Sequence, residues 1–176
     1  MSPTDATAEL APPPAPVEAG RRRGAPRQAR RTARPAHGIA EADLEACRAA
    51  IRTGSHSFHA ASKLLPERYR APALALYAFC RLADDSVDLH DEKTAAVLRL
   101  GERLDAAYAG RPENAPTDRA FTAMVEATAM PRTLPEALLE GLAWDAMERR
   151  YASLSELRAY SARVAAAVGA MMTVIM

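Results

Sequence analysis

From residue 40 onward, apolar residues recur at intervals of three and four, which is the spacing of one face of an α-helix. In the first such segment Leu44, Cys47 and Ile51 share a face, and the pattern predicts a helix over residues 41–53. No stretch shows the strict alternation that indicates a β-strand, so we expect an all-α fold. The further helices that the pattern predicts span residues 72–87, 93–109, 118–129 and 135–151, with a sixth after residue 153.

Residues that start and stop helices fall at these boundaries. Gly54 follows the first helix, where glycine is preferred. Pro72 suits a first turn, because its missing N–H would have no helical partner there. Ser153 with Glu156 three residues later has the spacing of a capping box. Residues 55–65 are polar and rich in serine, and we expect an irregular connection there.

The first 39 residues differ from the rest in composition, and we expect a disordered tail ahead of one helical domain over residues 40–176. Repeated prolines disfavour a helix in this tail, and it has little apolar surface to bury. The arginine-rich run from Arg21 to Arg34 is open to three readings: a handle for anionic lipid or nucleic acid, a solvated tail, or translation upstream of the natural start. Because it lacks interleaved aromatic residues, we expect no nucleic-acid partner.

Composition and charge exclude few classes of function. A chain of 176 residues can bury one core, and a net charge of +1 favours no particular partner. Cys47 and Cys80 form no paired motif, so we expect a reducing, cytoplasmic compartment. We see no apolar signal segment and no apolar run of spanning length. Peripheral contact with the inner face of the membrane, and the oligomeric state, stay open.

The chemistry of the chain is concentrated in residues 77–91, where an apolar segment ends in four aspartates. On a helix, Asp84 and Asp88 lie side by side, with Arg81 one turn earlier and Tyr77 a turn before that. Carboxylates at the negative end of a helix dipole are unfavourable, which points to a counter-ion. Two carboxylates one turn apart suit Mg²⁺, which keeps several waters and bridges to phosphate oxygens. A solvated acidic helix end is the equally open alternative.

Several short segments follow one another in the order and at about the spacing of the squalene/phytoene synthase family. The chain resembles its bacterial phytoene synthases most, and the resemblance covers roughly residues 40–176. An isolated D-x-x-x-D would be a weak signal, but the ordered set is a strong one. The matching segments are Ser55-His56-Ser57-Phe58, Leu65-Pro66-Glu67-Arg68, Tyr77-Ala78-Phe79-Cys80-Arg81, Asp84-Asp85-Ser86-Val87-Asp88, Glu140-Gly141-Leu142-Ala143-Trp144-Asp145, and the helix from Tyr160 to Gly169.

This resemblance implies an isoprenoid synthase-type helical bundle, incomplete in this chain. It implies a prenyltransferase that joins two geranylgeranyl diphosphate molecules head to head to give phytoene, in carotenoid biosynthesis. By the same resemblance, Asp84 and Asp88 hold Mg²⁺, or alternatively Mn²⁺, and Arg81 and Tyr77 complete the catalytic set and contact the substrate. No nicotinamide cofactor is expected for phytoene formation.

The resemblance also assigns Ser55, Ser57 and Phe58 to the substrate entrance. Hydroxyls and backbone N–H groups ahead of a helix can hold diphosphate oxygens. Capping and turn chemistry is the alternative for these residues. Arg68 and Arg70 could also reach an anionic substrate, but we expect both to be solvated.

Asp145 is a further candidate, at the edge of the substrate site. It matches a recurrent aspartate in the family's D-G-M-x-x-D stretch, although Glu140 stands here where that stretch opens with aspartate. The alternative is a surface ion pair with Arg149, four residues on.

The family carries a second aspartate-rich motif, N-x-x-R-D-x-x-x-D, and the sequence reaches Met176 without one. We therefore expect a fragment that holds half of a metal site and is inactive alone. A squalene-type synthase using farnesyl diphosphate, a non-catalytic helical homologue or helper subunit, and a nucleic-acid-binding module that uses the arginine-rich run remain as alternatives.

Overall fold

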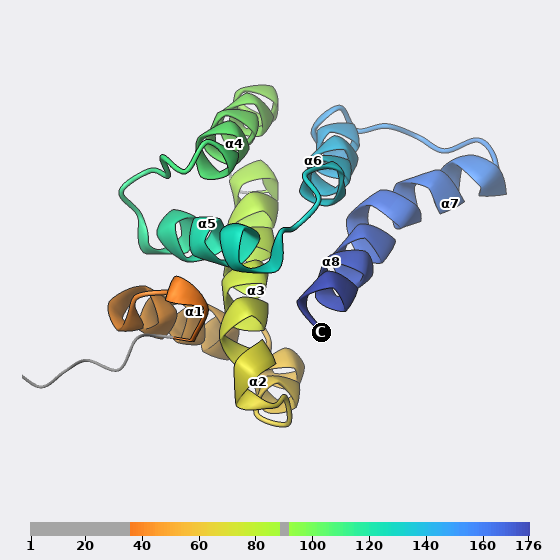
Figure 1. The fold of residues 1–176 in the computed structure, drawn as a ribbon. Helices are drawn as coiled ribbons and strands as arrows, with labels where there is room; N and C mark the ends of the chain where they lie inside the picture. The colour runs from red at the N-terminus through yellow and green to blue at the C-terminus, as the bar shows by residue number, and fades with distance from the viewer. Residues whose placement is uncertain (1–35, 89–91) are drawn as a thin grey trace, which may run out of the picture. The chain divides into compact units, whose positions relative to one another are not determined.

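The computed structural model describes residues 36–88 and 92–176, and these residues contain helices and no strand. The expected all-α class is therefore confirmed. Figure 1 shows the arrangement. The elements are η1 (Ala36–Gly38), α1 (Glu41–Gly54), α2 (His56–Ser62), α3 (Glu67–Asp88), α4 (Lys93–Tyr108), α5 (Pro116–Thr128), α6 (Thr133–Ala146), α7 (Leu154–Ser161), the π-helical η2 (Ala162–Ala166) and α8 (Ala167–Ile175).

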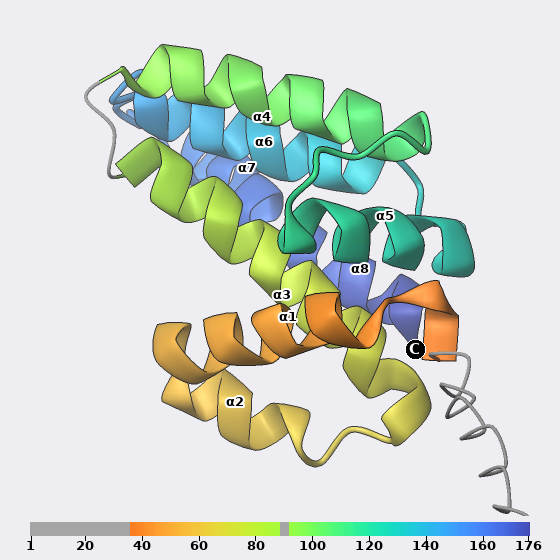
Figure 2. The ribbon, with the colours of Figure 1, turned by 90° about the vertical axis from the view of Figure 1, so that its left-hand side faces the viewer.

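Helix α3 lies at the centre and contacts α1, α4, α5, α6 and α8. In Figure 1, α1 and α5 lie on one side of it and α6 to α8 on the other. The small side chains of Ala75, Ala78 and Ala83 are buried on α3 and let neighbouring helices approach closely. Phe79 of α3 stacks on Phe121 of α5 with ring centroids 3.8 Å apart, and both rings are fully buried. Figure 2 shows α3 running diagonally from below α4 to behind α1.

Two buried carboxylates fix α5 against its neighbours. Asp43 of α1 accepts hydrogen bonds at 3.0 and 2.5 Å from the guanidinium of Arg119 on α5. Asp118 of α5 accepts a similar pair from Arg103 of α4, at 2.9 and 2.5 Å. Buried carboxylates need such partners, because an unpaired charge is costly to take out of water.

The prediction of an irregular connection over residues 55–65 is wrong in part, because seven of these residues form α2. Ser55 caps this helix: its Oγ accepts a hydrogen bond from the Phe58 N–H at 3.3 Å. The serine content that suggested a turn therefore supplies the helix cap instead.

Helix α3 begins at Glu67 rather than near Pro72, which lies inside the helix. A proline in this position leaves the carbonyl four residues earlier, that of Arg68, without its helical donor. His37 supplies a replacement, since its Nε2 donates to the Arg68 carbonyl oxygen. A contact across 31 residues thus makes the proline tolerable, and the local sequence gave no sign of it.

The fifth predicted helix also ends early, at Ala146 rather than near residue 151. The chain then turns through Glu148, whose backbone is left-handed with a φ of 51°. The capping box is confirmed: Ser153 Oγ accepts from the Glu156 N–H at 3.2 Å, and Glu156 Oε2 accepts from the Ser153 N–H at 3.1 Å.

The division into a tail and a domain stays a prediction, because most of residues 1–39 lie outside the described part of the chain. Of its last residues, Ala36–Gly38 form η1 and Ile39 is buried. Within the described ranges, no helix combines the length and the apolar character needed to cross a bilayer.

Gly141 of α6 allows η2 to pack closely. A Cβ at this position would lie 2.6 Å from Val164 Cγ1 and 2.9 Å from Arg163 Cβ. We expect Gly141→Ala to lower the free energy of unfolding by about 1–3 kcal/mol, measured by urea denaturation, because overpacking displaces η2. Gly101→Ala in α4 is the matched control. Nothing lies within 4 Å of a Cβ there, so it should stabilise by about 0.5–1 kcal/mol. A Gly141→Ala variant as stable as the parent would contradict this packing.

Candidate active site

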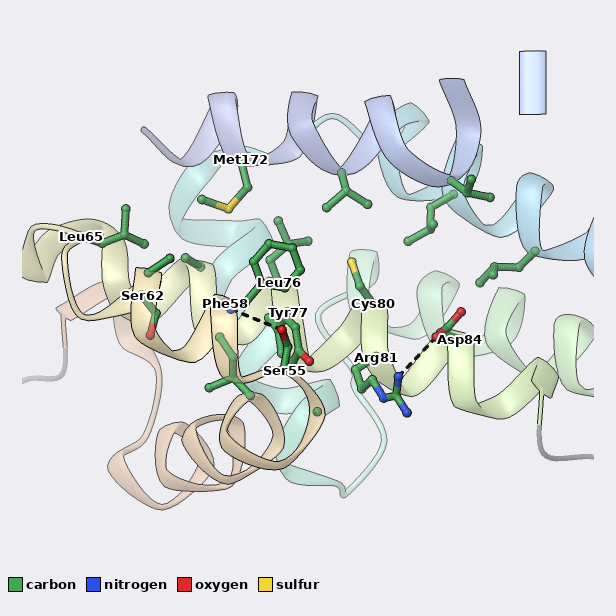
Figure 3. A pocket seen from close by; sticks show the side chains of 18 of the residues that line it. Ser55, Phe58, Ser62, Leu65, Leu76, Tyr77, Cys80, Arg81, Asp84 and Met172 are labelled. Carbon is green, nitrogen blue, oxygen red and sulfur yellow. Dashed lines mark hydrogen bonds and ion pairs between the residues drawn. The ribbon is translucent and has the colours of Figure 1, made fainter. Parts of the chain in front are cut away.

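A cavity of about 760 Å³ lies along α3 and carries most of the residues that the sequence singled out. The end of α1 and helix α2 form one wall, and α6, α7, η2 and α8 form the other. Figure 3 shows Leu65 and Met172 toward one end of the cavity and Arg81 and Asp84 toward the other. Most of the lining is apolar, including Leu65, Leu76, Leu138, Leu142, Val168 and Met172. The site is therefore a long apolar space with its charges at one end.

One wall depends on a regular spacing in the last helical segments. Tyr160, Val164, Val168 and Met172 follow one another at four-residue intervals, and all four line the cavity. They belong to α7, η2 and α8 in turn.

The charged end is built from the C-terminal turns of α3. Arg81 Nη2 lies 2.6 Å from Asp85 Oδ1, and its Nη1 lies 3.6 Å from Asp84 Oδ2. Asp84 lines the cavity, whereas Asp88 is exposed at the end of the helix and is not among the lining residues. Arg81 thus pairs more closely with Asp85 than with Asp84.

Asp84 has a pKa raised above its ordinary value, first because burial removes solvent and next because of the negative charge of Asp88. Arg81 opposes this rise, and Asp85 and Asp145 add to it. A carboxylate among other carboxylates is held away from its charged form unless a cation is close. The expected proximity of Asp84 and Asp88 is thus visible in the electrostatics of the site.

Asp145 reaches the same end of the cavity from α6. It accepts a hydrogen bond from the hydroxyl of Tyr160 at 2.9 Å. Burial and this carboxylate raise the pKa of Tyr160 to about 12, so the phenol keeps its proton. Arg149 instead lies over the Trp144 ring at 4.1 Å, beyond the end of α6. Asp145 therefore faces the cavity, where the resemblance placed it.

An aromatic and cationic cluster backs this hydrogen bond. The ring of Tyr151 lies 5.1 Å from that of Tyr160 and 6.2 Å from that of Trp144. The guanidinium of Arg163 packs over the Trp144 ring at 4.4 Å. It also forms an ion pair with Glu140, with 3.0 Å between Nη2 and Oε1. These contacts fix the angle at which α7 and η2 leave α6, and with it the position of Tyr160.

The serine-rich segment lies at the edge of the cavity. Ser55 lines it, but Ser57 is exposed and does not, although the two hydroxyl oxygens are 3.2 Å apart. Phe58 lines the cavity while remaining 62% exposed, and its ring meets the Tyr77 ring edge-on at 6.1 Å. A Cβ on Gly54 would overlap the Tyr77 hydroxyl, so any larger residue at this position would displace the Tyr77 ring.

The donors at the charged end fit a hard divalent cation in part. Asp84 and Asp88 supply carboxylate oxygens, and burial together with the negative charge of Asp88 raises the pKa of Asp84. Across residues 36–88 and 92–176, no group of three or more His, Cys, Asp or Glu side chains is close enough to enclose an ion. Mg²⁺ does not need such a cage, because it binds through one or two carboxylates and completes its shell with water and phosphate oxygens.

Comparison with known proteins identifies the family to which the chain belongs. Residues 51–176 match the family model for squalene/phytoene synthase, and the chain belongs to this family. It is 69% identical over 141 residues to a phytoene synthase of Rhodobacter capsulatus and 66% identical over 148 residues to one of Cereibacter sphaeroides. Each match covers 78% of this chain and 42% of the relative, so the chain spans less than half the length of these relatives.

Solved structures give the same family. A dehydrosqualene synthase bound to a ligand aligns with a TM-score of 0.71 at 30% identity, over 76% of this chain and 47% of that one. A squalene synthase of Alicyclobacillus acidocaldarius aligns with a TM-score of 0.71 at 28% identity, over 80% of this chain and 55% of that one. The expected isoprenoid synthase-type helical fold is confirmed.

Sequence reasoning missed several residues of the cavity. Tyr160 was part of a recognised segment, yet nothing local linked it to Asp145, 15 residues earlier. Leu138, Leu142 and Met172 look like ordinary core residues on helical faces, so no signal marked them as cavity lining.

We expect Asp84→Asn to raise the urea midpoint of the metal-free chain at pH 7. The pKa of Asp84 in the folded chain lies above its ordinary value of 3.8, chiefly because the side chain is partly buried. The folded state therefore binds this proton more tightly than the unfolded state, and stability is lost as pH rises from near 3.8 through the folded pKa. The gain from Asn should thus be full at pH 7 and absent below about pH 3.

Asp85→Asn is the control, since it removes the 2.6 Å ion pair with Arg81 and should not stabilise. An equal gain from both variants would show that the effect comes from net charge rather than from the surroundings of Asp84.

Proposed function

We propose that this chain is the part of a phytoene synthase that binds a prenyl diphosphate through the first aspartate-rich motif. The reaction is the head-to-head condensation of two geranylgeranyl diphosphate molecules. The single observation that carries the proposal is the cavity: it is apolar along most of its length and places Arg81 and Asp84 together at one end. This distribution suits a ligand with a long hydrocarbon chain and an anionic head.

The charged end binds the diphosphate. Mg²⁺, or Mn²⁺ in its place, would be held by Asp84 and Asp88 and would supply positive charge to the departing diphosphate. Arg81 contributes a fixed guanidinium close to the same place, and its pair with Asp85 holds it there. Fixed charges of this kind favour departure of diphosphate, because they need little reorganisation as negative charge develops.

The apolar walls hold the hydrocarbon chain and keep water away from the allylic cation that remains. Water would otherwise capture this cation before the second substrate could attack it. The rings of Phe58 and Tyr77 lie near the charged end, and aromatic faces attract cations. Burial and the hydrogen bond to Asp145 raise the pKa of Tyr160 to about 12, so it presents a neutral phenol to the cavity.

The proposal extends to cofactors and surroundings. We infer no need for nicotinamide, because phytoene formation includes no reduction step. Cys47 and Cys80 are free thiols, which supports a reducing, cytoplasmic location. Contact with the inner face of the membrane would give the apolar substrate and product a short route to and from the cavity.

Identity favours geranylgeranyl diphosphate over farnesyl diphosphate. The two phytoene synthases are 69% and 66% identical to this chain, whereas the dehydrosqualene and squalene synthases are 30% and 28% identical. No specific feature of the described residues favours a non-catalytic helper.

The test is an assay of the complete reading frame with geranylgeranyl diphosphate and Mg²⁺, with farnesyl diphosphate in parallel. We expect phytoene from the parent and a loss of at least about 100-fold in kcat from the Asp84→Ala/Asp88→Ala variant, because the charge that draws the diphosphate away is gone. Glu126→Ala, an exposed acid on α5 outside the cavity, is the control and should retain activity.

The outcomes separate the parts of the proposal. Phytoene from both the parent and the double variant would refute the role of Asp84 and Asp88. Product only from farnesyl diphosphate would replace phytoene synthase by a squalene-type synthase. No product from either substrate would favour the non-catalytic homologue.

A further inference from the structure

Helix α2 forms a wall of the cavity although little of it is buried. It has seven residues, and helices this short are not stable alone in water. Ser62 is its one buried residue, and Phe58 is 62% exposed. In the turn that follows, Leu64 is 87% exposed. Apolar burial therefore contributes little to holding α2 in place beyond the edge-on contact of Phe58 with Tyr77, and polar contacts add to it.

Arg70, in the second turn of α3, makes the contacts at the C-terminal end. Its Nε donates to the Ser62 carbonyl oxygen at 3.1 Å, and its Nη2 donates to the carbonyl oxygens of Lys63 at 3.0 Å and Leu65 at 2.9 Å. The last carbonyls of a helix lack intrahelical donors and form the negative end of its dipole. Ser62 is the last residue of α2, and Lys63 and Leu65 lie in the turn that follows, so this guanidinium holds both the end of α2 and the turn into α3.

At the N-terminal end, Ser55 follows directly on α1 and caps α2 locally, since its Oγ accepts from the Phe58 N–H at 3.3 Å. Between these two attachments, Phe58, Ala61 and Ser62 line the cavity, and Leu65 follows directly after them. Among the described residues, the side-chain hydrogen bonds that join this wall to α3 come from Arg70, beside the ring contact of Phe58 with Tyr77.

We propose that Arg70 is a positioning residue of this site: it fixes α2 against α3, so that the cavity has a rigid wall for the hydrocarbon chain of the ligand. This role differs from the solvated arginine expected from the sequence and from direct binding of diphosphate. It rests on the proposed function only for the identity of the ligand.

Two substitutions separate this role from a general effect of charge. Arg70→Lys keeps the charge but loses the planar fork, so one ammonium cannot reproduce the separate Nε and Nη2 contacts. Arg68→Gln is the matched control, because the Arg68 side chain lies two residues away and packs over the Tyr69 ring at 4.6 Å.

Hydrogen exchange of the free chain tests the attachment without any ligand. In Arg70→Lys we expect backbone amides of residues 59–65 to exchange about tenfold faster, as local opening of α2 becomes easier. Exchange in α1 and α5 should stay unchanged, and Arg68→Gln should match the parent. Unchanged exchange in residues 59–65, or a uniform increase over all helices, would overturn the proposal.

Ligand affinity distinguishes a role in the cavity wall from a general loss of fold stability, because only the first would weaken binding of one probe and spare the other. With Mg²⁺ present, we expect Arg70→Lys to weaken binding of a non-reactive geranylgeranyl thiodiphosphate about tenfold and to leave the affinity for inorganic diphosphate unchanged. Equal weakening of both probes would make Arg70 a diphosphate ligand and overturn the positioning role. If the parent binds neither probe, the proposed function loses its support, whereas the exchange experiment still decides the role of Arg70.

Discussion

The burial of α3 is the constraint on which the rest of the structure depends. This helix packs against α1, α2, α4, α5, α6 and α8, yet its last turns carry aspartates that cannot be buried without compensation. Buried alanines and the Phe79–Phe121 stack allow the neighbouring helices to pack closely around α3. Arg81 and the opening of the cavity compensate in part for the charge of the aspartates. The charged end of the site therefore lies where the central helix emerges from the core.

The sequence was sufficient for features that depend on local spacing. The helical class, the Ser153 capping box and the common face of Tyr77, Arg81 and Asp84 all follow from intervals of three or four residues. Contacts between residues far apart in the chain could not be predicted from local spacing. Pro72 was taken for a helix start because nothing near it reveals that His37 supplies the missing donor.

The same limit explains what was missed in the site. Residues 55–65 looked irregular because their polar composition hides a short helix whose C-terminal end is held by Arg70 of α3. Asp145 looked like half of a surface pair because the turn that carries Arg149 away from it lies beyond the reach of helical periodicity. The family resemblance supplied the place of Asp145 at the site but not the helix over residues 56–62.

The π-helical segment η2 has a geometric consequence for the cavity. In an α-helix each residue advances by about 100°, so residues four apart drift by about 40° per step and would leave a common line within a few turns. A π-helical turn holds more residues, which reverses part of this drift. Tyr160 can therefore share one line with Val164, Val168 and Met172. The segment acts as a phase correction that keeps the polar and apolar parts of one wall facing the same ligand.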